Sequence, residues 1–329
     1  MTLFWMLILT GAFVCRGVRG ETNGTLTFLM VGDWGGAEWE PYYTHAEQSI
    51  AEQMGIVGEK IGSSFTISVG DNFYLLGVRD VDDHRFQDTY ENVFTAESLQ
   101  STWYSVCGNH DHYGNASAQV AYTDKSSRWH MPNYYYNEVV TIPDTDVDVE
   151  FVFIDTVILA GNTHPTKTWL PPPGPESVNA AEDQWEWIEE TLAASTAKWL
   201  FVVGHYPVWS ISLHGPTEVL VERLRPMLIK YNVSAYFCGH EHDMQHIREW
   251  NGTVEYFISG AGHGIRCSAD NIDNIPPASL KYHFGNIDLD SRIGAFNWVS
   301  ISPTSMNVSF VDQTGYPIYF YSMEPTRNV

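Results

Sequence analysis

The chain has 329 residues, of which 44% are hydrophobic and 14% aromatic, enough to bury the core of one large domain or two small ones. Its formal net charge of −23 excludes the basic surface that binds nucleic acids or anionic membranes, so we expect no nucleic-acid partner. Beyond the first 20 residues no run reaches the ~20 apolar residues of a membrane span, so we expect none.

The N-terminus resembles an export signal. Residues 1–14 form a short apolar run, and residues 15–20 end in small residues at the positions that signal peptidase prefers. We predict a cleaved signal peptide over 1–20 and a single domain over 21–329. The alternatives are a buried N-terminal strand and an uncleaved signal anchor.

Five Asn-X-Ser/Thr sequons support export, because such sites are glycosylated in secreted proteins. We expect an N-glycan at Asn115 and consider four further sites, at Asn23, Asn232, Asn251 and Asn307. The protein is therefore expected to be secreted or lysosomal.

Strand-like and helix-like segments alternate along the chain. Apolar runs bounded by turn residues predict strands at 25–31, 65–69, 103–107, 149–154, 199–203, 235–238 and 254–258. Helical patterns cover 44–60, 181–194 and 216–231, the last with a proline near its start. Residues 282–321 show no helical periodicity of apolar residues and are predicted to form further strands. The alternation favours a layered α/β fold.

Cysteine usage predicts no disulfide framework. Three cysteines follow the predicted signal peptide, namely Cys107, Cys238 and Cys267, and an odd number cannot pair completely. Cys107 and Cys238 each end an apolar run, so we expect buried thiols there. The segment 163–176 is rich in proline and is predicted to be an exposed loop within the domain.

Five short motifs that join a glycine to Asp, Asn or His follow predicted strands. They are Gly32–Gly35, Gly70–Tyr74, Gly108–Asp111, Val203–His205 and Gly239–His242. In open α/β sheets the ligand crevice forms at the carboxyl ends of the strands, where glycines let the backbone turn sharply. Each motif alone is more often an ordinary turn or a solvated histidine. Five of them in one chain, all at strand ends, predict a single site.

The side chains of these motifs are ligands of hard and borderline metal ions. Carboxylate, amide oxygen, phenolate and imidazole bind Fe, Mn and Zn. Asp71 has two oxygens and can bridge two ions about 3.5–4 Å apart. Tyr74 favours a trivalent ion such as Fe(III), because a phenol with a pKa near 10 loses its proton only to a strong Lewis acid.

The order of the motifs resembles the purple acid phosphatases of the calcineurin-like metallophosphoesterase superfamily, specifically the animal, tartrate-resistant type. Trp34 and Tyr74 fit this type, whereas a generic member of the superfamily has His at the first position and lacks the Tyr. The resemblance extends over four longer matches, His205–Ser210, His214–Thr217, Gly108–His112 and Ser259–Gly262. It implies an α/β fold, a layered β-sandwich flanked by helices, in one metallophosphoesterase domain.

The resemblance also divides the ligands between two metal ions. The ligands implied for Fe(III) are Asp33, Asp71, Tyr74 and His242. The ligands implied for the divalent ion are Asp71, Asn109, His205 and His240. Asp71 is common to both sets. The divalent ion is Fe(II) in the animal enzymes and Zn or Mn in plant relatives.

Three more residues receive catalytic roles by resemblance. His110 and His214 match two histidines that face the substrate, and Asp111 is expected to orient His110 through a ring nitrogen. The implied function is an acid phosphatase that hydrolyses phosphate monoesters, of small molecules or phosphoproteins, by attack of a metal-bound hydroxide. One histidine protonates the leaving group; we favour His214, and the resemblance leaves the choice open.

Two features depart from the animal type. The positions of its disulfide are occupied by Ala160 and Val219, and the residues of the loop 163–176 do not match. Two other functions remain open: a secreted iron-binding glycoprotein with incidental phosphatase activity, and a phosphodiesterase or nucleotide pyrophosphatase on the same platform. An inactive interaction module is disfavoured because no ligand is missing.

Overall fold

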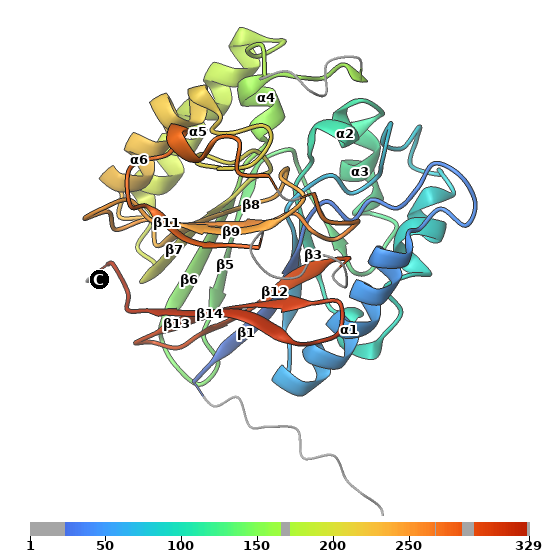
Figure 1. Ribbon diagram of the computed structural model, residues 1–329, viewed down its shortest axis with the longest axis horizontal. Coiled ribbons are helices and arrows are strands. Elements are labelled where there is room, and N and C mark those ends of the chain that lie inside the picture. Colours follow the sequence, from blue (N-terminus) through green and yellow to red (C-terminus); the bar gives the residue numbers. More distant parts are fainter. Residues whose placement is uncertain (1–23, 166–171, 267, 285–292, 328–329) are drawn as a thin grey trace, which may run out of the picture.

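Two seven-stranded β-sheets packed face to face form the molecule, with helices on their outer faces (Figure 1). The computed structural model describes residues 24–165, 172–266, 268–284 and 293–327. The predicted α/β fold, a layered β-sandwich flanked by helices, is confirmed. The predicted signal peptide, Asn23, Cys267 and part of the loop 163–176 lie outside the described residues.

The first sheet has the strand order β14–β13–β12–β1–β2–β3–β4. Its strands are β1 (Leu26–Val31), β2 (Phe65–Ser68), β3 (Trp103–Ser105), β4 (Trp129–His130), β12 (Ala295–Ile301), β13 (Met306–Asp312) and β14 (Pro317–Met323). β1 to β4 run parallel, whereas β12 to β14 form an antiparallel extension beside β1.

The second sheet has the order β11–β9–β10–β8–β7–β6–β5. Its strands are β5 (Tyr136–Thr141), β6 (Asp148–Phe153), β7 (Trp199–Val203), β8 (Ala235–Cys238), β9 (Met244–Ile247), β10 (Glu255–Ser259) and β11 (Leu280–His283). β6, β7, β8 and β10 are parallel to one another, and β5, β9 and β11 are antiparallel to their neighbours. All seven strands predicted from apolar runs are present.

The α-helices are α1 (His45–Ile61), α2 (Asn109–His112), α3 (Ala116–Tyr122), α4 (Thr156–Ala160), α5 (Val178–Ala194) and α6 (Arg225–Lys230). Short π- and 3₁₀-helices occur at η1 (Phe86–Glu91), η2 (Glu97–Leu99), η4 (Leu220–Leu224) and η5 (Ile272–Asn274). Figure 1 shows α1 beside the first sheet and α5 and α6 beside the second. In the described part of the chain, no helix combines the length and apolar character required to cross a membrane.

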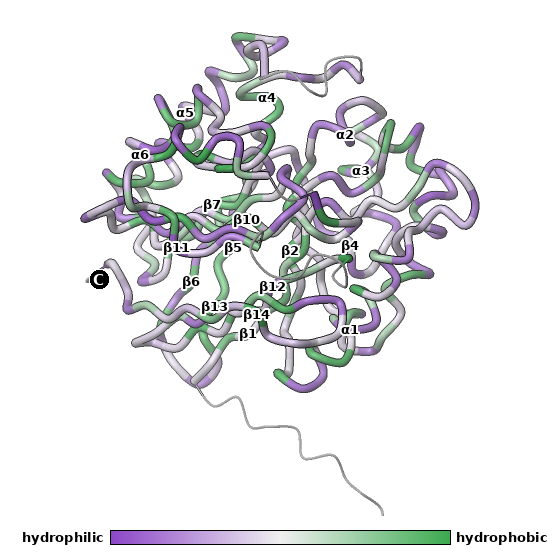
Figure 2. The backbone as a smooth tube through the Cα atoms, viewed as in Figure 1, coloured by the Kyte–Doolittle hydropathy of each residue, from purple (hydrophilic) through white to green (hydrophobic). Residues whose placement is uncertain are grey.

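Alternation of side chains along the strands creates two cores. Phe28 of β1 packs edge-on against Phe151 of β6, with ring centroids 5.4 Å apart, in the core between the sheets. The neighbouring Val152 points to the other face, where a second core includes Trp185 of α5 and Leu228 of α6. Burial on both faces explains the continuous apolar runs. In Figure 2 hydrophobic residues gather in the central strands, and the periphery is mostly hydrophilic.

One predicted helix differs from the structure, and the strands predicted near the C-terminus are divided between the two sheets. The helix expected over 216–231 appears as the π-helix η4 followed by α6, because Pro226 at the start of α6 has no N–H to continue a regular α-helical ladder. Of the strands expected in 282–321, only β12 to β14 extend the first sheet; β11 joins the second. Which of the two sheets a strand joins depends on the neighbouring strand with which it pairs. The residues of the strand itself do not specify that neighbour.

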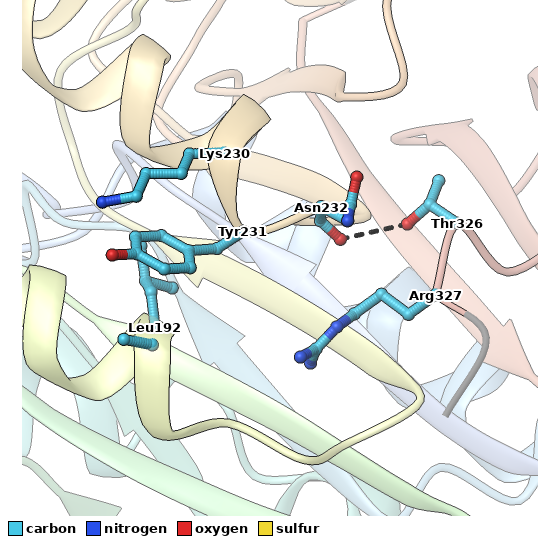
Figure 3. A pocket seen from close by; sticks show the side chains of 7 residues that line it. Leu192, Lys230, Tyr231, Asn232, Thr326 and Arg327 are labelled. Carbon is cyan, nitrogen blue, oxygen red and sulfur yellow. Dashed lines mark hydrogen bonds between the residues drawn. The ribbon is translucent and has the colours of Figure 1, made fainter.

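The C-terminal segment packs against the ends of α5 and α6. A pocket there is lined by Lys230, Asn232, Thr326 and Arg327 (Figure 3). The Thr326 hydroxyl donates to the Asn232 carbonyl at 3.1 Å, and the Arg327 guanidinium donates to the carbonyls of residues 195 and 197. These cations and hydroxyls are already paired with chain oxygens, so we assign this pocket a structural role.

Candidate metal centre

The five motif loops converge at one end of the sandwich. They follow β1, β2 and β3 in the first sheet and β7 and β8 in the second, all at the carboxyl ends of parallel strands. Backbone hydrogen bonds join neighbouring loops, with the Asp33 N–H donating to the Gly70 carbonyl at 2.9 Å and the Gly239 N–H to the His205 carbonyl at 3.0 Å. Parallel pairing of these strands therefore brings together the motifs that the sequence places at their ends.

Three of the expected ligands have left-handed backbone conformations. The φ angles of Asp33, Asp71 and His240 are 55°, 53° and 72°, a region that costs a non-glycine residue on the order of 1–3 kcal/mol. Side chains of other ligands hold this backbone: Asp33 Oδ2 accepts the His240 N–H at 2.8 Å. Gly108 is required beside them, because a Cβ there would lie 2.2 Å from Asp71 Oδ1.

One group of donor atoms gathers around Tyr74. Its hydroxyl lies 2.9 Å from Asp33 Oδ1 and 3.0 Å from His242 Nε2, and those two atoms are 3.6 Å apart. Asp33 and Tyr74 are buried, whereas His242 is partly exposed. These are three of the four residues implied for the trivalent ion.

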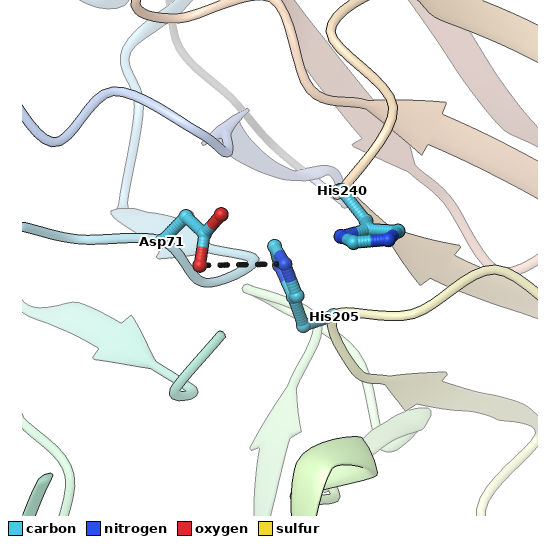
Figure 4. A group of neighbouring side chains, drawn as sticks. All are labelled: Asp71, His205 and His240. Atoms are coloured by element: carbon cyan, nitrogen blue, oxygen red, sulfur yellow. Dashed lines mark ion pairs between the residues drawn. The ribbon is translucent and has the colours of Figure 1, made fainter. Parts of the chain in front are cut away.

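A second group gathers around His205. Its Nε2 lies 3.4 Å from Asp71 Oδ1 and 3.2 Å from Asn109 Oδ1. The ring nitrogen Nδ1 contacts the Val69 carbonyl at 2.9 Å, which orients Nε2 toward the site. His240 completes the group, with ligand atoms of His205, His240 and Asp71 all within 4.8 Å of one another (Figure 4). This is the set implied for the divalent ion.

Buried carboxylates dominate the electrostatics of the centre and favour a cation beside them, whether a proton or a metal ion. Burial, reinforced by Asp71, raises the pKa of Asp33 well above its usual value despite the opposing effect of His205. Burial acts to lower the pKa of His205, but Asp71 outweighs burial and the pKa lies at about 9, so a metal ion bound at this ring would displace a proton. Burial lowers the pKa of His242 to about 3, which keeps that imidazole neutral, as metal ligation requires.

The donor set fits a pair of metal ions. Two ligand atoms that would each lie about 2.1 Å from the same ion would be about 3–3.5 Å from each other. The separations of 2.9, 3.0 and 3.6 Å around Tyr74, and of 3.2 and 3.4 Å around His205, match that expectation. Both groups contain oxygen and imidazole nitrogen, the ligands of Fe, Mn and Zn.

The two histidines expected to face the substrate are held differently. His110 Nδ1 lies 2.7 Å from the Leu75 carbonyl, so the tautomer with a proton on Nδ1 donates there and leaves Nε2 for other partners. His214 Nδ1 lies 3.1 Å from Glu241 Oε2, and its ring is 4.3 Å from that of His240. Both rings are partly exposed, as substrate contact requires.

Asp111 holds the loops together and makes a different contact from the expected one. Its carboxylate accepts the backbone N–H groups of Asn72 and Gly108 at 3.1 and 2.8 Å, whereas the ring of His110 contacts Leu75 instead. In a helical turn adjacent side chains point in different directions, so Asp111 faces the buried backbone of the loops while His110 faces the site. Asp111 therefore acts on the loop that carries Asp71.

Sequence reasoning missed three residues that support the ligands. The buried Arg85 guanidinium donates to the carbonyls of Gly35 and Tyr74 and so ties two ligand loops together. Glu241 accepts the N–H of His214 at 3.0 Å besides contacting its ring, and Tyr113 contacts Asn109. Glu241 lies within the motif Gly239–His242 and Tyr113 directly follows the motif Gly108–His112, so the sequence could have indicated both. Nothing in the sequence indicates Arg85.

A second group that could bind a metal is Cys107, His112 and Asp155. His112 Nε2 and Asp155 Oδ2 are 2.7 Å apart, and the other Asp155 oxygen accepts two N–H groups at the start of α4. These contacts already satisfy the pair. Cys107 and Cys238 are buried free thiols, as predicted, and burial raises the pKa of each.

Comparisons with known proteins agree with this geometry. The family model described as calcineurin-like phosphoesterase matches residues 26–244. The chain is 40% identical to the tartrate-resistant acid phosphatase type 5 of Oryctolagus cuniculus over 315 residues, which covers 95% of each chain.

Two solved structures share the fold. GAP50, described as the anchor in the inner membrane complex of Plasmodium, superposes with a TM-score of 0.76 at 24% identity, covering 93% of this chain and 90% of the other. A purple acid phosphatase from yellow lupin seeds superposes with a TM-score of 0.60 at 16% identity, covering 92% of this chain and 54% of the other. At these identities the likeness concerns the fold alone.

Proposed function

We propose that the phosphatase centre of this chain pairs Fe(III) with a divalent ion. The premise is that the chain belongs to the purple acid phosphatases of the tartrate-resistant type, within the calcineurin-like phosphoesterases. The divalent ion is Fe(II), with Zn and Mn as alternatives. The observation that supports this most directly is the presence of two donor groups at the same end of the sandwich, one built around the phenol of Tyr74 and one that contains Asp71 and no phenol.

In this proposal the Fe(III) ligands are Asp33, Asp71, Tyr74 and His242. The phenol supports iron, because burial and two carboxylates raise the pKa of Tyr74 further above its usual value, and only a strongly charged ion offsets that cost. The ligands of the divalent ion are Asp71, Asn109, His205 and His240. When bound, the two ions supply Lewis-acid chemistry: they ionise water and offset the negative charge of the phosphoryl group.

The chain's own residues bind and protonate the substrate. In a protonated His110 ring both nitrogens are donors, so Nε2 donates to a phosphoryl oxygen while Nδ1 donates to the Leu75 carbonyl. Glu241 fixes His214 through its backbone N–H and through Nδ1, so the exchangeable proton of Nε2 is the one presented to the leaving oxygen. We therefore assign phosphate binding to His110 and leaving-group protonation to His214.

The visible spectrum and metal content of the purified protein test this proposal together. A phenolate bound to Fe(III) gives a charge-transfer band in the visible, so the protein should be purple or pink, with two metal ions per chain and hydrolysis of p-nitrophenyl phosphate. A colourless, iron-free protein with full activity would contradict the iron assignment. Iron and colour without phosphatase activity would instead favour the iron-binding glycoprotein.

We further propose that the protein is secreted or lysosomal and carries an N-glycan at Asn115. The Asn115 side chain is exposed, and the hydroxyl of the sequon serine, Ser117, donates to its amide oxygen at 2.6 Å. Asn232 and Asn251 are exposed and Asn307 is partly so, which leaves them as further candidates. The substrates are phosphate monoesters of small molecules or phosphoproteins.

A further inference from the structure

The amide of Asn109 has a partner on each side. Its Oδ1 faces His205 Nε2 at 3.2 Å, and its Nδ2 donates to the hydroxyl of Tyr113 at 2.9 Å. Only the oxygen of an amide has lone pairs for a metal, since the NH₂ group is solely a donor. The orientation of this amide therefore decides whether Asn109 can be a ligand.

We propose that Tyr113 is the positioning residue that holds the Asn109 oxygen toward the divalent ion, and thereby sets the affinity of that half of the centre. This inference rests on the proposed role of Asn109 as a ligand. Tyr113 itself contacts the amide nitrogen and so acts through another residue.

The local fold places the tyrosine for this role. Asn109 and Tyr113 are four residues apart in the turn formed by α2, and the Tyr113 N–H donates to the Asn109 carbonyl at 3.1 Å. Residues at this spacing lie on the same side of a helix. The Tyr113 ring packs edge-on against His110, with centroids 5.0 Å apart, so the position of the hydroxyl is fixed independently of the amide.

The amide needs such a partner because its terminal torsion is broad and roughly two-fold. Rotation by half a turn would put NH₂ toward His205 and remove the ligand atom. Asn109 is buried, at 1% exposure, so water cannot readily replace the tyrosine hydroxyl. The carboxylate of Asp71 has no such requirement, since either of its oxygens can bind an ion.

The test measures binding of Zn²⁺ alone to full-length protein that retains Fe(III). Tyr113→Phe keeps the ring against His110 and removes only the hydroxyl. We expect the Zn²⁺ dissociation constant to rise about ten- to hundredfold, the usual effect of losing a residue that orients a metal ligand. The visible band should stay unchanged, because Asp33, Tyr74 and His242 are not in contact with the substituted hydroxyl.

Tyr206→Phe is the matched control. The ring of Tyr206 lies 4.6 Å from that of His240, and its hydroxyl donates to the Gly161 carbonyl at 3.1 Å. The substitution therefore removes a hydroxyl from a residue beside the same ligands and leaves the contacts of Asn109 unchanged. We expect its Zn²⁺ affinity to stay within about twofold of the wild type. A loss as large as that of Tyr113→Phe would overturn the proposal.

A double-mutant cycle with Asn109→Asp separates orientation from packing, because a carboxylate presents an oxygen in either orientation. In that background Tyr113→Phe should change the Zn²⁺ affinity less than about twofold. An equal loss in both backgrounds, or no loss in the native one, would overturn the role of Tyr113. Wild-type protein that binds no Zn²⁺ would instead overturn the proposed divalent site itself.

Discussion

At the scale of single residues, Tyr74 is the side chain that distinguishes the two halves of the centre. Its oxygen lies about equally far from Asp33 Oδ1 and His242 Nε2, at 2.9 and 3.0 Å. Histidine and carboxylate ligands occur in both halves, whereas the phenol occurs in one. The half with the phenol is therefore the one we assign to Fe(III), and its colour reports on a single residue.

We predict that Tyr74→Phe abolishes the visible band while the protein stays folded and retains much of its hydrolysis. Asp33, Asp71 and His242 still bind the ion, so only the charge-transfer partner is lost. The measurement is the visible spectrum beside far-ultraviolet circular dichroism and iron content. Tyr90→Phe, at a buried tyrosine whose hydroxyl has no hydrogen-bond partner among the residues that the structure describes, is the control and should keep its colour. Colour in Tyr74→Phe would show that another residue is the phenolate.

The two histidines differ in what holds them, and we predict that their variants differ in kinetics. His214→Ala should slow alkyl phosphates by about 10²–10⁴-fold and p-nitrophenyl phosphate much less, because nitrophenolate leaves without a proton. His110→Ala should affect both substrates alike, through binding. The measurement is kcat/KM for both substrates against pH. Equal losses on the two substrates in both variants would mean that neither histidine is the acid.

At the scale of elements, a buried polar network ties an edge of one sheet to the other. His246 of β9 contacts Glu255 of β10 and the hydroxyl of Tyr319 of β14, each at 2.8 Å, while the Tyr321 hydroxyl donates to Glu255 at 2.7 Å. Burial lowers the pKa of His246 more than Glu255 raises it. A neutral ring satisfies both contacts, since Nε2–H donates to the carboxylate and Nδ1 accepts from the phenol.

We predict that His246→Ala lowers the free energy of unfolding by about 2–3 kcal/mol at pH 7, because the buried Glu255 loses the partner of Oε2 and keeps those of Oε1, Tyr321 and Arg248. The loss should shrink in acid. The pKa of His246 in the folded protein lies below its value of about 6.5 in the unfolded chain, so the stability that His246 contributes is fully present above about pH 6.5. That stability is lost as the pH falls below about 6.5, because the unfolded chain then binds a proton more readily than the folded protein does. Urea unfolding of both proteins at pH 7 and pH 5 checks this. A loss that grows in acid would contradict the neutral ring.

At the scale of the whole molecule, the metal centre joins the two sheets. Its proposed ligands come from loops after β1, β2 and β3 on one side and after β7 and β8 on the other. Without cations, buried carboxylates remain next to one another in a chain of net charge −23. Bound ions therefore stabilise the sandwich as well as serve the chemistry.

We predict that removing the metals lowers the unfolding temperature, and that restoring them raises it as the metal concentration rises. An ion present at 100 times its dissociation constant adds about 2.7 kcal/mol per site to the folded state. Asp71→Ala, which lacks the shared ligand, should bind little metal and unfold at the same temperature with or without chelator. Thermal unfolding followed by circular dichroism, with metal analysis, measures this. A chelator-sensitive Asp71→Ala protein would place the stabilising ion elsewhere.

The sequence by itself determined the fold class and predicted which residues meet at the proposed metal centre. Apolar runs long enough for strands, interrupted by helical periods, leave few arrangements other than a layered α/β fold. Parallel strands share an edge, so polar residues that directly follow them, such as Asp71 and His205, converge whatever the details of packing. These inferences depend on local pattern and on residue order, which a sequence contains.

Only the tertiary structure decided which groups orient the ligands. Arg85 binds two ligand loops, Glu241 holds the ring of His214, and Asp111 contacts backbone instead of His110. The contact between His246 and Tyr319 joins residues 73 positions apart and depends on which sheet each edge strand enters. Such contacts follow from the directions in which side chains point after the sheets have packed, and those directions are a property of the assembled sandwich and not of any one segment.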